Sequence, residues 1–244
     1  PVGPTNTPTN TPNVPPTNTP TSTPTPIPSN ANFFLSLASN GTAGGVTASD
    51  EDILRFNQGL FTIAFDGSDV GISGDIDAFT FLDSDTILFS LEATTTVGAL
   101  GSVDSFDIIQ FDASSLGTTT AGTFSLYFDG SDVGLDSSSE NIDAFELLPD
   151  GRLLISTSGS PAIAGLSSIA DEDILAFAPT SLGANTAGSW SLYFDGSDVG
   201  LSANSGDIDE LSVAANGDLY LSMRTDFAVG ALAVQAFYGV LPGP

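Results

Sequence analysis

Most of the chain alternates short apolar runs with polar turns, which is the pattern of antiparallel β-strands. In one such run, Phe124, Leu126 and Phe128 are separated by single Ser and Tyr residues, so their side chains would share one face of a strand. Residues 61–65 and 190–194 repeat this register. No segment shows a sustained helical period, and we therefore predict an all-β protein.

An octapeptide gives the chain an internal repeat. The sequence Phe-Asp-Gly-Ser-Asp-Val-Gly-Ile occupies residues 65–72 and returns, with Leu at its last position, at residues 128–135 and 194–201. An acidic segment follows each copy, and an apolar strand with a central Ser lies further along each repeat. A recurring unit of this kind is the signature of an architecture that stacks supersecondary motifs.

Each repeat is predicted to form four strands. In the clearest unit these are residues 142–148, 152–157, 173–178 and 189–195. The Asp-Gly pair at 150–151 favours a tight turn between the first two strands. The second strand is apolar throughout, as expected when both of its faces are buried. Four meandering strands with an Asp-Gly turn after the first resemble a propeller blade of the NHL type.

The predicted fold is therefore all-β, with antiparallel meander repeats in a β-propeller-like arrangement. A β-sandwich, a prism and a solenoid are the alternatives, because the first and last repeats hold fewer strands than the middle ones, and propellers usually have about four blades or more. Strands supplied by a neighbouring molecule are a further alternative. We place the repeat domain at residues 31–244, with units at about 31–74, 75–140, 141–205 and 206–244.

Residues 1–30 have a different composition, in which Thr, Pro and Asn dominate. Such a tract cannot bury apolar surface and favours the extended polyproline II conformation. We predict a stalk or linker here, and the tract resembles the Thr-Pro spacers that tether bacterial surface proteins. Dense Thr beside Pro also suits O-glycosylation. The candidate glycosylation sites are Asn40, which lies in an Asn-Gly-Thr sequence, and Thr5, Thr7, Thr11, Thr19, Thr21, Thr23 and Thr25.

The charge and the missing residue types exclude several functions. The chain has 30 acidic residues, three basic ones, no His and no Cys, for a net charge of −27. This charge repels nucleic acid, and no apolar run is long enough to span a membrane as a helix. The usual general bases, nucleophiles and transition-metal ligands are missing, and the carboxylates are copied in every repeat rather than set in one asymmetric pair. We predict that the protein is not an enzyme.

The acidic residues gather in three loops of each repeat. Asp, Gly and Ser are ordinary turn residues, so turn chemistry alone is one interpretation. The other is Ca²⁺, which takes about six to eight oxygen ligands and would neutralise crowded carboxylates. The candidate metal ligands are Asp50, Asp52, Asp66, Asp69, Asp75, Asp77, Asp104, Asp107, Asp129, Asp132, Asp143, Asp171, Asp173, Asp195, Asp198, Asp207 and Asp209.

The last repeat supplies one argument for a shared ligand. It carries Gln235 and Tyr238 where the second repeat has Asp104 and Asp107, and no octapeptide follows it. The acids of one loop thus disappear together with the other loop, as expected if the two loops bind the same ion. A degenerate terminal repeat would look similar.

The predicted function is that of a secreted or cell-surface structural protein, which self-assembles into an extracellular filament or layer through its incomplete terminal repeats and its N-terminal tail. One alternative is a Ca²⁺-dependent adhesin that binds glycans or proteins; Tyr127, Tyr193 and Trp190 would suit a sugar-binding surface, although their places in strands fit ordinary sheet packing. Another is an accessory domain of a secreted hydrolase. The expected partners are a second copy of the chain or surface glycans.

The octapeptide and the acidic segment after it also resemble repeats of uncharacterised bacterial extracellular proteins. The resemblance covers about residues 50–224. It implies an extracellular or cell-surface location and implies no activity.

Overall fold

The structure, a computed structural model, describes residues 31–201, 206–224, 227–229 and 232–234. Its strands pair in antiparallel sheets, and its helical segments are 3-10 turns of three or four residues. The all-β prediction is therefore confirmed. In this part of the chain no helix has the length and apolar character needed to cross a membrane. The predicted stalk and its seven candidate threonines lie outside the described residues.

Four sheets follow one another along the chain, and within each the strands pair in chain order. The first sheet contains β1 (Asn32–Leu35), β4 (Ile53–Asn57) and β5 (Leu60–Phe65). The second contains β6 (Ile76–Phe81), β7 (Thr86–Leu91), β10 (Ile108–Ser115) and β11 (Ala121–Phe128). The third contains β12 (Ile142–Leu147), β13 (Leu153–Thr157), β14 (Ile174–Ser181) and β15 (Ala187–Phe194). The fourth contains β16 (Ile208–Val213) and β17 (Leu219–Met223).

Small hairpins interrupt this order, and the four-strand prediction missed them. They are β2 (Gly41–Ala43) with β3 (Val46–Ala48), β8 (Thr95–Val97) with β9 (Gly101–Val103), and β18 (Phe227–Val229) with β19 (Leu232–Val234). The first was detectable in the sequence, because Thr and Ala alternate around a glycine pair. Gly44 and Gly45 both have positive φ, 55° and 89°, as two-residue hairpin turns require.

Five 3-10 turns complete the described elements. They are η1 (Ser68–Val70), η2 (Gly98–Leu100), η3 (Ser131–Val133), η4 (Ser138–Glu140) and η5 (Gly196–Val199). Three of them, η1, η3 and η5, lie inside the three octapeptides. The octapeptide is therefore a turn with a defined backbone and not an open loop.

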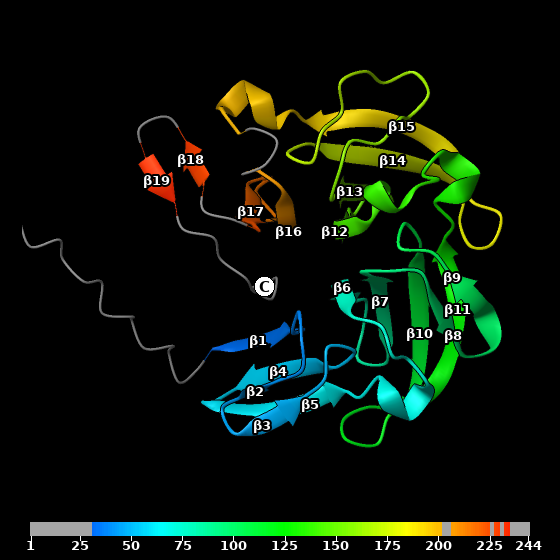
Figure 1. Ribbon diagram of the computed structural model, residues 1–244, viewed down its shortest axis with the longest axis vertical. Helices are drawn as coiled ribbons and strands as arrows, with labels where there is room; N and C mark the ends of the chain where they lie inside the picture. Colours follow the sequence, from blue (N-terminus) through cyan, green and yellow to red (C-terminus); the bar gives the residue numbers. More distant parts are fainter. Residues whose placement is uncertain (1–30, 202–205, 225–226, 230–231, 235–244) are drawn as a thin grey trace, which may run out of the picture.

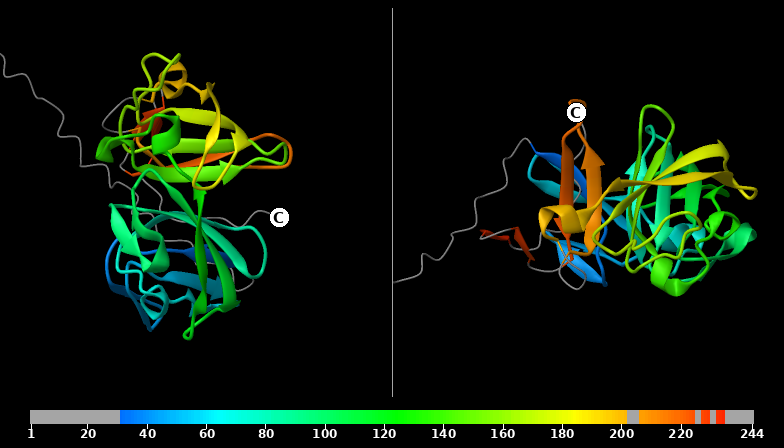
Figure 2. Two further views of the ribbon diagram at one scale, coloured as in Figure 1. Left: turned by 90° about the vertical axis from the view of Figure 1, so that its right-hand side faces the viewer. Right: turned by 90° about the horizontal axis from the view of Figure 1, so that it is seen from above.

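The sheets are arranged radially around a common centre (Figure 1). The innermost strand of the third sheet, β12, lies between β6 and β16, the innermost strands of the second and fourth sheets. Seen from the side, the first two sheets (blue to green) form one half of the molecule and the last two (green to orange) the other (Figure 2). Successive sheets meet through their faces and turn their first strands inward, and the propeller-like arrangement stays a prediction.

Backbone hydrogen bonds join successive repeats at this centre. The N–H of Ile76, at the start of β6, donates to the Asp50 carbonyl of the preceding repeat at 3.2 Å. The N–H of Ile142 donates to the Ser105 carbonyl at 3.0 Å, and the N–H of Ile208 reaches the Asp171 carbonyl in the same way at 3.2 Å. The first N–H of each of these inner strands is therefore bonded to a backbone carbonyl of the preceding repeat.

Aromatic side chains fill the space between successive sheets. In the first two octapeptides, the opening Phe packs edge-on against a Phe of the next sheet, Phe65 on Phe111 with ring centroids 5.1 Å apart and Phe128 on Phe177 at 5.3 Å. All four rings are fully buried, and burial of a ring this large contributes about 1.5–3 kcal/mol. The core is thus a series of apolar layers between repeats, and each layer needs the next sheet to cover it.

Candidate functional site

The first aspartate of each octapeptide closes its own turn. Asp66 accepts a hydrogen bond from the Ser68 hydroxyl at 2.8 Å, and Asp129 accepts one from Ser131 at 2.7 Å. The third copy repeats this contact between Asp195 and Ser197. The glycine at the end of each turn, such as Gly71 with a φ of 81°, has the left-handed backbone that other residues avoid. These aspartates act as turn residues.

A second group of aspartates fastens the octapeptide to the third strand of its own repeat. Asp52 accepts from the Ser49 N–H at 2.8 Å and from the Gly67 N–H at 3.1 Å. Asp107 does the same for Asp104 and Gly130, and Asp173 for Ala170 and Gly196. Burial raises the pKa of Asp107 to about 6, although the hydrogen bonds from the Asp104 and Gly130 N–H groups lower it. The two loops expected to share an ion are therefore joined directly by a hydrogen bond.

In the first two octapeptides, the second aspartate binds the next repeat. The Asp69 carboxylate accepts from the Thr120 N–H at 2.8 Å. The Thr120 hydroxyl accepts from the Asp66 N–H at 2.9 Å and donates to the Gly117 carbonyl at 2.9 Å, while the Gly117 N–H donates to the Ala64 carbonyl at 2.8 Å. We call this set of contacts, between the octapeptide of one repeat and the last hairpin of the next, a loop–hairpin lock.

The second octapeptide forms the same lock with the third sheet. The Asp132 carboxylate accepts from the Thr186 N–H, and the Thr186 hydroxyl accepts from the Asp129 N–H, both at 2.9 Å. The Gly183 N–H donates to the Tyr127 carbonyl at 2.7 Å. In Figure 1 the first two octapeptide turns, after β5 and β11, each lie against the hairpin tip of the following sheet. The same contacts occur twice, far apart in the chain, so the lock is a recurring feature of the repeat.

Sequence reasoning missed the threonines of the locks. Their signal is the repeated sequence Leu-Gly-x-x-Thr-Ala-Gly at residues 116–122 and 182–188. In the sequence alone it is typical of an ordinary turn, and only the fold shows that it contacts the octapeptide. Thr120 and Thr186 are both buried although they lie in hairpin tips, and that burial reflects the contact.

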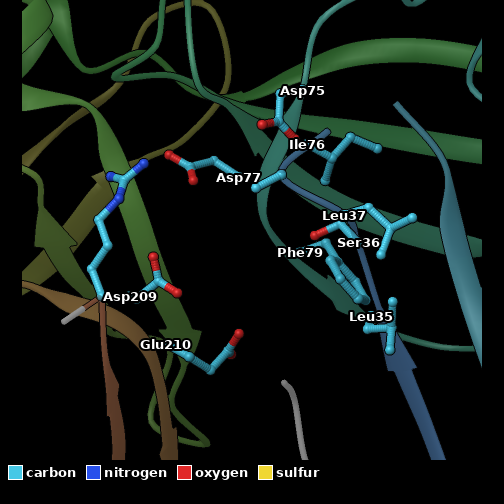
Figure 3. A pocket seen from close by; sticks show the side chains of 11 residues that line it. Leu35, Ser36, Leu37, Asp75, Ile76, Asp77, Phe79, Asp209 and Glu210 are labelled. Atoms are coloured by element: carbon cyan, nitrogen blue, oxygen red, sulfur yellow. The ribbon is translucent and has the colours of Figure 1, made fainter. Parts of the chain in front are cut away.

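Five further candidate metal ligands lie in the inner strands or directly before them and form what we call the acidic centre. Its members are Asp75, Asp77, Asp143, Asp207 and Asp209. A cavity of about 400 Å³ opens beside them. Figure 3 shows Asp75 and Asp77 on one side of this cavity and Asp209 and Glu210 on the other, with Leu35 to Leu37 forming an apolar wall.

Burial and mutual repulsion disfavour ionisation in the acidic centre. Asp143 has no exposed surface and lies against the carboxyl group of Asp207, and no N–H or hydroxyl group donates to its carboxylate oxygens. Burial raises its pKa well above the usual range, and the nearby Asp207 and Asp77 raise it further. Burial, reinforced by the charge of Glu92, raises the pKa of Asp77 to about 8. Burial also raises the pKa of Asp75, to about 7.

Two polar neighbours offset part of this cost. The Asn141 amide donates to Asp77 at 2.7 Å and to Glu92 at 3.0 Å. The Arg224 guanidinium lies 3.7 Å from the Glu92 carboxylate, and its charge lowers the pKa of Asp209 against the larger effect of burial. One Asn and one Arg are too few to neutralise five aspartates, so protons or cations are needed.

The calcium assignment stays a prediction. Among the described residues, no three acidic side chains are placed as a preformed metal site. Three further candidates complete the set. Asp50 and Asp171 lie near enough to the acidic centre for their charges to raise the pKa of Asp75 and of Asp207, and Asp104 accepts from the Thr94 hydroxyl. Among the candidate metal ligands, the buried aspartates of the acidic centre have the greatest need of a neutralising proton or cation.

The predicted N-glycosylation site lies at the surface. Asn40 is exposed, and its side-chain oxygen accepts the Asp50 N–H at 3.0 Å. Glycosylation at Asn40 stays a prediction, as does O-glycosylation of the threonines outside the described residues.

Comparison with known proteins gives no family. No family model matches the chain, and no curated protein matches it either. Among solved structures, the chain is similar to the extracellular domain of a protein from B. thetaiotaomicron described as a hybrid two-component system, with 12% identity and a TM-score of 0.35 over 86% of this chain and 34% of the other. A second structure, described as the extracellular domain of a one-component system from the same organism, has 10% identity and a TM-score of 0.32 over 84% and 33%. The chain thus spans about a third of the length of these structures.

The acidic centre predicts that stability falls as pH rises. Its raised pKa values mean that the folded protein holds more protons than the unfolded chain. The favourable contribution is complete below the ordinary aspartate value of 3.8, and it is lost as pH rises through about 7 for Asp75 and about 8 for Asp77. We expect the free energy of unfolding, measured by urea titration without divalent cations, to decrease from pH 5 to pH 8.

The variant Asp143→Asn isolates this effect. It removes the most deeply buried carboxyl, so we expect it to raise the free energy of unfolding at pH 8 by on the order of 2 kcal/mol and to flatten the pH dependence. Asp85→Asn removes an exposed acid and is the matched control. A pH profile of Asp143→Asn identical to that of Asp85→Asn would contradict the assignment.

Calcium binding is tested by thermal unfolding with Ca²⁺ and with a chelator. A ligand at about 100 times its dissociation constant adds about 2.7 kcal/mol of stability, so the midpoint should rise clearly. Asp143→Asn should abolish the rise if the ion lies in the acidic centre, whereas Asp66→Asn should abolish it if the octapeptides hold the ion. An identical midpoint in calcium and in chelator would show that calcium does not bind to the folded protein.

Proposed function

We propose that this protein is a structural module of a secreted or cell-surface protein. The observation that carries the proposal is the loop–hairpin lock, which occurs twice with the same bonds. The most repetitive residues of the sequence, those of the octapeptide, are thereby used to hold one repeat against the next. This use favours a rigid body over a reactive site.

The chemistry of the acidic residues supports a non-enzymatic role. Hydrolysis by carboxylates needs one acid and one base with separated pKa values. In the described residues the aspartates instead form repeated sets, in which Asp77, Asp143 and Asp209 hold the same place in their repeats. Repeated sets suit structural neutralisation, by protons or by cations, better than one catalytic event.

The location outside the cell rests on the sequence. A Thr/Pro-rich tract adjoins the repeats, and a net charge of −27 keeps a large surface hydrated and apart from its neighbours. The resemblance of the octapeptide to repeats of bacterial extracellular proteins supports the same location.

A Ca²⁺-dependent binding module is the second candidate, and the cavity beside the acidic centre favours it. Its Asp75, Asp77 and Asp209 would hold a cation that in turn coordinates hydroxyl groups of a glycan. A glycan array probed in calcium and in chelator separates the two functions, since only the binding module gives calcium-dependent spots. The accessory-domain hypothesis stays a prediction.

Self-assembly into a filament also stays a prediction, and the locks limit how it would occur. The last hairpin of the first sheet turns through Gln58 and Gly59, and it lacks the Leu-Gly-x-x-Thr sequence. A head-to-tail contact between the third octapeptide of one copy and the first sheet of another is therefore not a lock. Electron microscopy of the purified protein shows whether filaments form by other contacts.

The structural role predicts that the locks stabilise the whole domain. Thr120→Val and Thr186→Val preserve side-chain shape but leave the N–H of Asp66 or Asp129 without its acceptor. We expect each to lower the free energy of unfolding by about 1–3 kcal/mol. The measurement is equilibrium unfolding in urea, followed by far-ultraviolet circular dichroism and by the fluorescence of Trp190.

Thr123→Val is the matched control, because Thr123 is an exposed strand residue outside the lock. If Thr120→Val and Thr186→Val unfold at the same urea concentration as Thr123→Val, the locks do not hold the sheets together and the proposed function loses its basis.

A further inference from the structure

A second cavity, which we call the intersheet cleft, opens between the first and second sheets. It has a volume of about 470 Å³, within the range of about 300–1,000 Å³ that is usual for small-molecule sites. It shares no lining residue with the cavity beside the acidic centre. Its apolar wall comes from β1, β5, β6 and the hairpin tip of the first lock, and consists of Phe34, Ile63, Ala64, Phe81 and Leu116.

The first repeat has a small residue in this cleft where the later repeats have a tyrosine. Ala64 precedes the first octapeptide, whereas Tyr127 and Tyr193 precede the other two. The Tyr127 ring packs against the apolar core between the second and third sheets, and burial raises the pKa of its hydroxyl. The backbone is alike at both places, because the Ala64 carbonyl accepts from Gly117 as the Tyr127 carbonyl accepts from a glycine of the next hairpin. The intersheet cleft therefore lacks a ring that fills the same place in the second repeat.

Arg55 lies in the cleft with most of its donors unused. It occupies the place in β4 that Gln110 and Ala176 hold in the next two repeats. Its Nε donates to the Asn32 side chain at 3.0 Å, and its guanidinium lies 5.7 Å from the centroid of the Phe34 ring, within reach of a cation–π interaction. Its terminal nitrogens bond to no other described residue. Together these nitrogens match the two oxygens of a carboxylate.

The other two basic side chains of the protein are used differently. Arg152 lies 2.8 Å from the Asp150 carboxylate, and Arg224 lies 3.7 Å from that of Glu92. Arg55 forms no ion pair within the described part of the chain. Its charge therefore remains to be balanced by solvent or by a ligand.

Asp83 adds the opposite charge to the same cleft. It lies in the turn between β6 and β7, where its Oδ1 accepts from the N–H groups of Asp85 and Thr86, both at 2.8 Å. The bond from Asp85 lowers the pKa of Asp83, so the carboxylate is ionised at neutral pH. Arg55 and Asp83 line one cleft without pairing with each other. A ligand between them can therefore bind to both.

These charges select the class of ligand. A simple anion would suit Arg55, but the net charge of −27 repels it, and a simple cation would be repelled by Arg55. A zwitterion suits both side chains and carries no net charge. An α-amino acid has a carboxylate and an ammonium group on one carbon, and its side chain would lie against Phe34 and Phe81, whose ring centroids are 4.5 Å apart.

We propose that the intersheet cleft binds a free α-amino acid with an apolar side chain. Arg55 binds its carboxylate, Asp83 binds its ammonium group, and its side chain occupies the space above Ala64. This site goes beyond the structural function, which needs no ligand.

The test is isothermal titration calorimetry of the full chain with L-phenylalanine, which should bind saturably. Phenylacetate and phenethylamine should each bind at least ~10-fold more weakly, because each lacks one of the two charge-assisted bonds. D-galacturonate, a sugar with a carboxylate and no ammonium group, should not bind. Saturation by D-galacturonate and not by L-phenylalanine, or no saturable heat at millimolar L-phenylalanine, overturns the proposal.

Ala64→Tyr locates the ligand, because it introduces the ring of the second repeat. It should abolish binding and leave the far-ultraviolet circular dichroism unchanged, since Tyr127 holds the same place in a folded repeat. A folded Ala64→Tyr variant that binds L-phenylalanine as the unmodified protein does would contradict the site.

Two charge variants decide the matter even if Ala64→Tyr does not fold. Arg55→Gln and Asp83→Asn should each weaken binding at least ~10-fold. Arg152→Gln and Asp85→Asn make the same charge changes outside the cleft and should leave binding unchanged. Equal binding by Arg55→Gln and Arg152→Gln overturns the proposal. Failure of amino-acid binding leaves the structural function intact, because that function is judged by the unfolding of the lock variants.

Discussion

The hydrogen bonds between an octapeptide and the following hairpin determine how the sheets stand relative to one another. Asp66 and Asp69 hold Thr120 at the periphery, and the Asp50 carbonyl holds the Ile76 N–H at the centre. Two attachments at opposite ends of a sheet fix its angle to the next one, and the apolar layer containing Phe65 and Phe111 fills the wedge between them. Neither the layer nor the attachments would be complete in a single repeat, so stability arises between repeats, as in other repeat proteins.

The same geometry creates the electrostatic conflict of the acidic centre. Because each inner strand begins on a fixed carbonyl of the preceding repeat, Asp77, Asp143 and Asp209 are brought to one place, and the pKa of Asp143 rises with burial and with the charge of its neighbours. The stabilising free energy of the peripheral locks and the apolar layers must exceed the free-energy cost of burying these carboxyl groups. The balance makes the stability of the module responsive to protons.

The strands and their approximate places followed from the alternation of apolar and polar residues, since a sheet with one buried face imposes that alternation wherever it occurs. The locks did not follow from the sequence, because Thr120 and Asp69 lie in separate turns that each look complete. The sequence left two interpretations of the acidic loops open, turn residues and calcium ligands, whereas the structure divides these residues into turn closures, backbone acceptors, lock residues and the acidic centre.

The locks also bear on how the outer strands avoid unwanted pairing. Each filled lock adds a parallel bridge at the end of an outer strand, Phe65 to Gly117 and Phe128 to Gly183, so a hairpin tip shields the peptide groups there. Exposed strand edges are templates for aggregation, and natural sheets cover or interrupt them. The outer strand β15 has no such bridge among the described residues, and it contains no charged side chain that would repel an incoming strand. Solubility of the isolated module therefore depends on its overall negative charge, and salt that screens this charge should be the condition under which β15 causes association.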